Sequence, residues 1–281
     1  MEEIAHVKEI TTDRYTMKLT IDRFNKRVRV EDYRGHTESC LQIAVDAAQE
    51  IQAEKLIVKA RAGDVQKLIA EGFVYEASID RFYRGSDCFF MAKFYQNERR
   101  NSVNWEEGDR ILDSVTTLKK KGSPAVPPHD YEIRKATIDD AKKLAALYET
   151  VFEIYPTPMN NPDYITECMK KGTVFYVYTY EKEIVSAASA EIDMNEFNAE
   201  ITDCATLAAH RQFGLMRRLI EALEDDLRKE QIFCLYSIAR SLSYGMNAAF
   251  YGLGYTYKGR LANNCYIFDK LEDMNVWVKT C

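Results

Sequence analysis

Apolar residues in the second half of the chain follow helical and strand spacings in alternation. Four leucines recur at every fourth position and predict an amphipathic helix over about 215–229: Leu215, Leu219, Leu223 and Leu227. Runs of β-branched and aromatic residues, separated by turn residues, predict strands over 173–180, 184–194, 199–207 and 231–239. This half therefore has the pattern of an α/β unit.

Further helix and strand signals flank this pattern. Thr137 precedes Asp139 and Asp140, which is typical of a helix start, and the apolar positions that follow predict a helix to about Val151. Two more helices are expected over 163–171 and 243–253, each followed by a glycine. Short strands are expected at 131–136, 255–257 and 266–268, with 276–278 as an edge strand.

The first half of the chain repeats part of this order. A strand over 55–60, a short helix over 64–71 before Gly72, and strands over 73–76 and 88–94 match the succession from 233 to 268. A helix is also expected over 41–51, after Tyr33-Arg34-Gly35, which resembles a remnant of a turn. Duplication and convergent α/β patterning both explain this echo, and we favour duplication.

A proline-rich and lysine-rich stretch divides the two halves. Residues 119–128 hold three of the six prolines and three consecutive lysines, a composition typical of a linker. We therefore expect an N-terminal lobe over 1–118, a linker over 119–129 and a C-terminal lobe over 130–281. A length of 281 residues suits two lobes of ordinary size.

Composition argues against several classes of function. The net charge of −6 disfavours non-specific nucleic-acid binding and suits a cationic substrate. No apolar run approaches the roughly 18 residues of a membrane span, and the N-terminus lacks a secretory signal. The seven cysteines form no C-x-x-C pair and the four histidines are scattered. We therefore expect reduced thiols, a cytoplasmic protein, no membrane partner and no metal site.

The segment 210–219 joins a predicted strand to the leucine-striped helix. The first N–H groups of a helix lack intrahelical partners and lie at the positive end of its dipole, which favours a bound phosphate. Gly214 lets the backbone approach an anion closely, and Arg211, Arg217 and Arg218 add positive charge. A phosphate-binding turn and an ordinary turn with solvated arginines are both consistent with this pattern.

This turn resembles the R/Q-x-x-G-x-G/A signature of the GNAT acetyltransferases through Arg211-Gln-Phe-Gly214, although Met216 replaces the last small residue. The resemblance implies the GNAT fold, of the α/β (α+β) class, with a mixed and mostly antiparallel sheet flanked by helices. The N-terminal lobe is then a degenerate, non-catalytic GNAT-like unit. The co-substrate implied is acetyl-CoA, its pantetheine lying along the strand that ends at Leu207, where a bulge splays that strand from its neighbour. The residues assigned to it are Thr206, Leu207, Arg211, Gln212, Phe213, Gly214, Leu215, Met216, Arg217 and Phe250.

The family's general acid has no direct counterpart. Residues 248–255 resemble the closing helix and Gly-aromatic pair of these enzymes, in which a tyrosine four residues before the glycine protonates the departing CoA thiolate. Counting back from Gly254 gives Phe250, while Tyr251 faces about 100° further round the helix. Tyr251 is our candidate acid. A water, no acid at all, and simple packing of Tyr251 are the alternatives.

A closer resemblance covers nearly the whole second half. The segments 199–207, 237–241, 245–247, 263–264 and 274–277 are similar to those of the β-lysine N-acetyltransferases. This implies transfer of an acetyl group from acetyl-CoA to the side-chain (N6) amine of β-lysine, giving the compatible solute N6-acetyl-β-lysine. The alternatives are a GNAT enzyme for another amine, such as a polyamine, a diamino acid or a protein lysine, and a non-catalytic acyl-CoA-binding regulator.

The reaction needs a base, because an alkyl amine with a pKa of about 10.4 attacks a thioester only when neutral. The acidic candidates on the central strands are Glu191, Glu200 and Asp203. Glu200 and Asp203 point to opposite faces of a regular strand unless a bulge intervenes, and Glu191 could meet Asp203 across the hairpin. We favour Glu200 and Asp203 as base or amine binders, then Glu191, although each alone could be a solvated strand residue.

The amino-acid part of β-lysine needs contacts of its own. A bidentate arginine suits the carboxylate, and Arg240 at the end of a central strand is our candidate. Asn247, Asn263 and Asn264 could supply neutral hydrogen bonds, although turns and caps also use asparagine. Backbone N–H groups near Thr206 and Leu207 would polarise the thioester oxygen. We expect the N-terminal lobe to cover or shape this site, or to make the contact of a homodimer.

Overall fold

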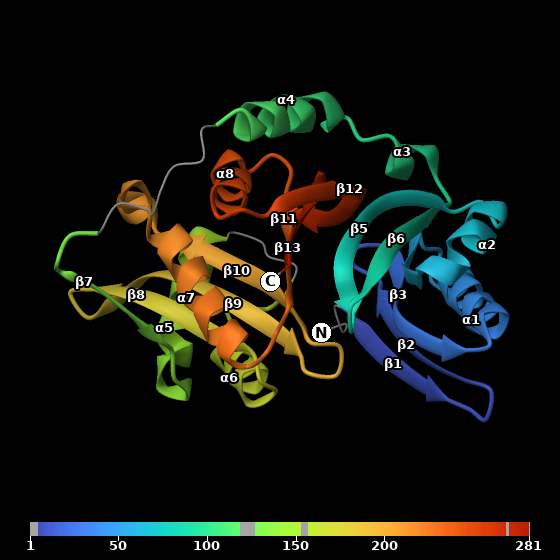
Figure 1. Ribbon diagram of the computed structural model, residues 1–281, viewed down its shortest axis with the longest axis horizontal. Helices are drawn as coiled ribbons and strands as arrows, with labels where there is room; N and C mark the ends of the chain where they lie inside the picture. Colours follow the sequence, from blue (N-terminus) through green and yellow to red (C-terminus); the bar gives the residue numbers. More distant parts are fainter. Residues whose placement is uncertain (1–4, 119–126, 153–156, 268–269, 281) are drawn as a thin grey trace.

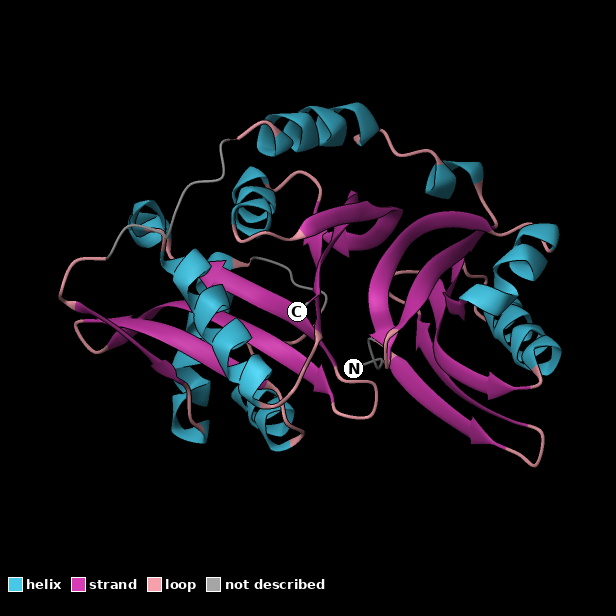
Figure 2. Ribbon diagram, viewed as in Figure 1, coloured by secondary structure: helices cyan, strands magenta, loops and turns pink. Residues whose placement is uncertain are grey.

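The computed structural model describes residues 5–118, 127–152, 157–267 and 270–280. The strands in these ranges form one 13-stranded twisted sheet, flanked by helices (Figures 1 and 2). The strands are β1 (His6–Thr11), β2 (Tyr15–Asp22), β3 (Arg27–Gly35), β4 (Lys55–Arg61), β5 (Val74–Tyr83), β6 (Ser86–Phe94), β7 (Tyr131–Lys135), β8 (Val174–Tyr180), β9 (Glu183–Asp193), β10 (Asn198–Thr206), β11 (Cys234–Arg240), β12 (Thr256–Ile267) and β13 (Lys270–Thr280). The helices are α1 (Thr37–Glu50), α2 (Val65–Ala70), α3 (Asn97–Arg100), α4 (Trp105–Thr116), α5 (Ala141–Val151), α6 (Pro162–Lys170), α7 (Leu215–Lys229) and α8 (Tyr244–Gly252), with 3-10 turns η1 (Ala62–Asp64), η2 (Ile138–Asp140) and η3 (Ala208–Phe213). No helix in these ranges has the length and apolar character of a membrane span.

The strand order β1-β2-β3-β4-β6-β5-β12-β13-β11-β10-β9-β8-β7 joins two lobes of the same connectivity. In each lobe a strand leads through a helix to a parallel neighbour, β3 through α1 to β4 and β10 through α7 to β11. Each lobe ends in a hairpin whose second strand lies beside that parallel pair. The repetition predicted from the sequence is therefore present in the topology.

The structure confirms most predicted elements of the C-terminal lobe and corrects its end. The bounds of β8, β9, β10, α7 and α8 agree with the sequence patterns to within one residue. The short strands expected at 255–257 and 266–268 are one strand, β12, as far as residue 267, and Phe268 lies outside the described residues. The expectation of an edge strand at 276–278 is wrong, because β13 lies between β12 and β11. Val276, Trp277 and Val278 are all buried, as suits an interior strand.

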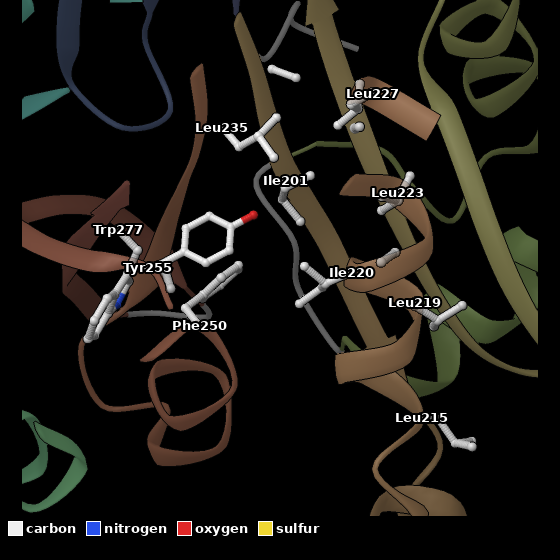
Figure 3. Close-up of a cluster of buried hydrophobic side chains, with 14 of the residues drawn as sticks. Ile201, Leu215, Leu219, Ile220, Leu223, Leu227, Leu235, Phe250, Tyr255 and Trp277 are labelled. Atoms are coloured by element: carbon white, nitrogen blue, oxygen red, sulfur yellow. The ribbon is translucent and has the colours of Figure 1, made fainter. Parts of the chain in front are cut away.

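Helices pack on both faces of the C-terminal half of the sheet. α7 buries its four predicted leucines against Ile201 of β10 and Leu235 of β11, next to Phe250, Tyr255 and Trp277 (Figure 3). On the opposite face, α5 and α6 bury Leu144 and Ile165. The predicted cap at Thr137 is a capping box with Asp140. Each buried leucine contributes about 1.5–3 kcal/mol, so these faces hold the lobe together.

The two lobes join at β5 and β12. These strands run antiparallel, with Ala77 opposite Gly259. Gly259 has a φ of 134°, and a Cβ there would lie 2.3 Å from the Glu76 carbonyl oxygen and 2.6 Å from the Ala77 Cα. The close approach of these backbones therefore requires glycine.

Buried cations of the N-terminal lobe hold an irregular segment of β12. Lys55 donates to the carbonyl of Ala262 at 2.8 Å and pairs with Glu76. Arg27 and Arg99 both donate to the carbonyl of Asn264, at 2.8 and 3.2 Å. Because a buried cation is costly unless paired, these bonds tie the lobes together.

The division between the lobes differs from the sequence expectation. Residues 119–126 of the expected linker lie outside the described residues. α4, which falls in the range expected for the N-terminal lobe, packs on α8 instead (Figure 1). Val115 of α4 enters the same core as α7, and the Tyr251 hydroxyl donates to the Thr116 carbonyl at 2.7 Å. By packing, α4 belongs to the C-terminal lobe.

Candidate active site

An opening separates the ends of β10 and β11. The two strands pair in parallel from Asn198 to Glu200 and then diverge. On the other side of β10, the pairing with β9 shifts between Thr202 and Ala205, where Asp203 has a φ of 47°. The bulge expected near the end of this strand is therefore present. Residues of both diverging ends, among them Asp203 and Ser237, line a cavity.

The turn before α7 is built for an anion. Gly214 caps the helix in the left-handed conformation, with a φ of 66°, and no side chain caps the first N–H groups. The first turn of α7 lacks an acidic residue and ends with Arg217 and Arg218, which the helix dipole disfavours in the absence of an anion. Arg217 donates to the Gly252 carbonyl at 3.2 Å, and its Nε is buried without a hydrogen-bond partner among the described residues. These groups fit a diphosphate.

Aromatic side chains pack against this turn and hold it in place. The Tyr131 hydroxyl and the His210 Nδ1 are 2.6 Å apart, and the Tyr131 ring packs against Tyr180 and Phe213. Arg211 folds back so that its Nε donates to the Thr206 carbonyl at 3.1 Å. The turn is therefore anchored before any ligand arrives.

A continuous cavity of about 2050 Å³ runs from this turn to the space between the lobes. Of the residues predicted to bind the coenzyme, those at its wall are Thr206, Arg211, Gly214, Leu215, Met216, Arg217 and Phe250. Leu207, Gln212 and Phe213 are not among the residues that line it. The Leu207 N–H donates to the Val185 carbonyl at 2.9 Å, so it is not free to polarise a thioester as expected.

Two predicted acidic residues meet on the wall of the cavity. Glu191 of β9 lies directly opposite Glu200 of β10 in the antiparallel register. The expectation that Glu191 would meet Asp203 is wrong, because the hairpin pairs Asn198 with Asp193 and its register brings Glu200 to that place. The Asp203 carboxylate is buried and accepts a hydrogen bond from Ser189 at 2.6 Å.

Burial and like charge perturb this carboxylate pair. Burial raises the pKa of Glu200 to about 7, and the neighbouring Glu191 adds to the shift. Lys59, Arg29 and a hydrogen bond with Tyr236 act in the opposite direction. Desolvation by the surrounding walls likewise raises the pKa of Glu191, although this side chain is exposed at the cavity. A carboxylate that titrates near neutral pH suits proton abstraction, and sites of this kind often show such shifts.

The residues at the expected position of the general acid have other partners. Phe250 is buried and packs edge-on against Tyr255, with ring centroids 5.1 Å apart (Figure 3). Tyr251 lines the cavity, but its hydroxyl donates to Thr116 on α4. The Tyr251 hydroxyl and the Phe250 ring are therefore not arranged as the resemblance implied for a general acid.

The predicted acceptor contacts fall into two groups. Arg240 lines the cavity but is engaged by Glu272, to which its Nε and Nη2 donate at 2.6 and 2.5 Å. Asn264 also lines the cavity, and its buried Oδ1 has no hydrogen-bond partner among the described residues. Asn264 therefore still fits a binding role, whereas the charge of Arg240 is already neutralised.

The other two asparagines serve the fold. The Asn247 amide group donates to the carbonyls of Arg240 and Ser243, and its oxygen accepts from Asn275 and Trp277. Asn263 donates to the carbonyls of Glu98 and Arg99. The expectation that these side chains contact the substrate does not fit, because neither is among the residues that line the cavity and both ends of the Asn247 amide are bonded to the protein.

Sequence reasoning missed the residues that the N-terminal lobe brings to the cavity. Arg29 and Glu31 of β3 and Lys59 of β4 line it, together with Tyr236 of β11. Arg29 and Glu31 alternate with the buried Val28 and Val30, a pattern that predicts a strand with one charged face. The sequence therefore indicated a charged face on this strand. It could not show that this face lies opposite Glu191 and Glu200, because that arrangement depends on how the two lobes join.

Comparison with known proteins places this site in a family. Residues 142–255 match the model of the Acetyltransferase (GNAT) family. The N-acetyltransferase YodP of Bacillus subtilis (strain 168) is 39% identical over 97% of this chain and 99% of that protein. A β-lysine N(6)-acetyltransferase of Methanosarcina mazei is 36% identical over 74% of this chain and 84% of that protein, and one of Methanococcus maripaludis is 29% identical over 99% and 96%. The solved ribosomal-protein-alanine N-acetyltransferase from Brucella melitensis is 19% identical, covers 53% of this chain and 99% of that chain, and has a TM-score of 0.47.

The chain belongs to the GNAT acetyltransferase family. It is an acetyl-CoA-dependent N-acetyltransferase, and the GNAT fold predicted from its sequence is confirmed.

Proposed function

We propose that this enzyme transfers the acetyl group of acetyl-CoA to the N6 amine of β-lysine, giving N6-acetyl-β-lysine. The observation that carries the proposal is the Glu191–Glu200 pair, which lies on the wall of the cavity that begins at the anion-binding turn. Paired carboxylates bind an ammonium group, and the raised pKa of Glu200 suits it to remove the proton. Two relatives that match most of the chain carry the name of this reaction.

Each part of the site then has a task in the mechanism. Acetyl-CoA supplies the acetyl group as a thioester. Gly214 and Arg217 hold the diphosphate, and the opening between β10 and β11 receives the arm that leads toward Glu200. Glu191 stabilises the incoming ammonium, and Glu200 takes its first proton so that the neutral amine attacks the thioester carbonyl. The C–N bond then forms, the C–S bond breaks, and the second proton of the nitrogen neutralises the departing CoA thiolate. Burial and the two carboxylates raise the pKa of Tyr236 well above its ordinary value, so its hydroxyl stays protonated and orients Glu200.

The catalytic role belongs to the C-terminal lobe in this proposal. At the equivalent place in the N-terminal lobe, the guanidinium of Arg61 fills the space between β3 and β4 and donates to the Tyr33 carbonyl at 2.6 Å and to Asp32 at 2.8 Å. The His36 side chain caps α1, and Glu38 lies in its first turn. A capped helix with an acidic first turn does not favour phosphate, in contrast to α7.

Release of CoA from acetyl-CoA tests the proposal, with β-lysine, α-lysine, ornithine and spermidine offered in parallel. We expect the highest kcat/KM with β-lysine, and mass spectrometry and NMR should locate the acetyl group on N6. A higher kcat/KM with any of the other amines would reject β-lysine as the acceptor and leave the acetyltransferase activity in place.

A further inference from the structure

A cluster of charged side chains from the N-terminal lobe lines the cavity opposite the carboxylate pair. Glu31 lies at its centre and accepts from Lys59 at 2.9 Å and from the Thr20 hydroxyl at 3.0 Å. The Arg29 Nε is also 2.9 Å from Glu31. Two cations share one carboxylate, so this wall carries a net positive charge. We call Thr20, Arg29, Glu31 and Lys59 the basic wall.

The facing wall is negative. It comes from the C-terminal lobe and consists of Glu191 and Glu200, with Tyr236 beside them. Arg29 and Lys59 lower the pKa of both carboxylates against the effect of burial, so the two walls interact across the cavity. A molecule between them therefore meets cations on one side and carboxylates on the other.

Direct contacts between the lobes fix the separation of the two walls. Asn198, two residues before Glu200, donates to the Phe82 carbonyl at 2.9 Å. Arg84, in the hairpin of β5 and β6, donates to the Asn195 carbonyl at 2.5 Å, and Arg34 pairs with Glu196. The part of the cavity between the two walls, here called the chamber, is therefore bounded by these contacts and by the pairing of β5 with β12 at Gly259.

We propose that the basic wall binds the carboxylate of the acceptor through Arg29, which makes an amino acid with a distal primary amine the substrate class of this enzyme. This inference rests on the proposed function and assigns the specificity of the same site. The amine of such a molecule would reach Glu191 and Glu200 while its carboxylate met Arg29. A diamine without a carboxylate would leave the basic wall without its anion.

Arg29 is better placed for this task than the other cations of the chamber. Its side chain is 35% exposed toward the cavity, whereas that of Lys59 is 16% exposed. Arg240, the arginine expected from the sequence, gives two donors to Glu272 alone. Glu31 pairs with the Arg29 Nε and is itself held by the Thr20 hydroxyl. Since no bond from the two terminal nitrogens of this planar guanidinium is seen among the described residues, they fit a second carboxylate.

The test compares two substrates that differ by the carboxylate alone. β-Lysine is paired with 1,4-diaminopentane, which is β-lysine without its carboxyl group. We expect Arg29→Gln to lower kcat/KM for β-lysine by roughly 10- to 100-fold, mostly through KM, because the contact is remote from the reacting atoms. Because Arg29 also lowers the pKa of Glu200, both substrates are compared at pH 9, where that carboxylate is ionised in either protein, and kcat/KM for 1,4-diaminopentane should fall much less than that for β-lysine.

Controls separate this effect from a folding defect. Arg23→Gln removes an exposed arginine of the same lobe that lies outside the cavity, and it should change neither value. Calorimetric binding of acetyl-CoA reports on the C-terminal lobe of each variant. If Arg29→Gln does not fold, Arg29→Lys keeps the charge but loses the bidentate geometry and should show the same selective loss in a smaller amount.

Two results would overturn the assignment of Arg29. One is an equal loss with both substrates, and the other is no loss with either. A preference of the wild-type enzyme for another diamino acid would reject the proposal that β-lysine is the acceptor. The assignment of Arg29 would then be tested in the same way, with that amino acid and the diamine formed by its decarboxylation. A wild-type enzyme that acetylates diamines as well as diamino acids would reject the inference by itself.

Discussion

Glu191 and Glu200 lie directly opposite each other on β9 and β10, on the wall of a cavity that both lobes enclose. Opposed like charges on neighbouring strands destabilise a sheet, so this pair costs stability unless a cation lies near it. Lys59 and Arg29 from the other lobe supply part of that charge, and the ammonium of a bound substrate would supply the rest.

The first prediction concerns the rate. Glu200 has a pKa of about 7 and must be ionised to act as a base, so kcat/KM should rise as pH increases through about 7. Glu200→Gln should lower kcat by roughly 10²-fold or more and abolish this rise. Steady-state kinetics between pH 5.5 and 9 checks this, with Glu183→Gln on the exposed part of β9 as the control. A pH profile that survives in Glu200→Gln would assign the base elsewhere.

The second prediction concerns stability. The pKa of Glu200 rises from 4.5 to about 7 on folding, so the folded state binds more protons between these values and loses stability as pH increases through that window. The neutral amide of Glu200→Gln cannot ionise. Thermal melts should therefore show a higher Tm for the variant than for the wild type at pH 8, and the same Tm at pH 4.5. A difference that does not depend on pH would mean that Glu200 is not shifted.

The third prediction concerns the anion-binding turn. Arg217 has a buried donor without a partner in the part of the chain that the structure describes, and a charge-assisted hydrogen bond contributes about 1.5–3 kcal/mol. Arg217→Gln should raise the KM for acetyl-CoA roughly 10- to 100-fold and leave the KM for the amine unchanged. Arg228→Gln, at the other end of α7, removes the same charge and should change neither constant. Equal effects of the two variants would indicate a general electrostatic effect of the helix.

The fourth prediction separates fold from substrate contact at Asn247. Its side chain holds the indole of Trp277 and the amide of Asn275 at 2.8 and 2.9 Å. Asn247→Ala should lower the free energy of unfolding by about 3 kcal/mol, because two buried donors lose their acceptor. Urea unfolding measures this, and Asn160→Ala at an exposed position is the control. An unchanged stability with a raised KM for the amine would restore Asn247 to the substrate site.

Local patterns predicted much of the C-terminal lobe. The leucine stripe of α7, the capping box at Thr137 and the turn at Gly214 each depend on residues close together in the sequence. The register of β9 and β10 was not predictable in the same way, because a shift of a few residues changes which carboxylate faces Glu191. The partners of Asn247 and Asn263 come from distant segments, and no local pattern indicates them. The basic wall was missed for the same reason.

Ala77 follows Gly72 by the same number of residues as Gly259 follows Gly254, and these two glycines come after α2 and α8. The strand pairing that joins the lobes therefore brings together equivalent positions of the two lobes. The strands are antiparallel, as they would be in an isologous contact across a two-fold axis. The chain has the form of a symmetric dimer whose two copies have become consecutive. Covalent linkage frees the copies from being identical, so one can keep the anion-binding turn while, at the equivalent place in the other, Arg61 bonds to Tyr33 and Asp32. In our proposal the sheet face of that second copy binds the acceptor. Two lobes joined by this one pair of strands can thus take different roles, which the identical subunits of a homodimer cannot.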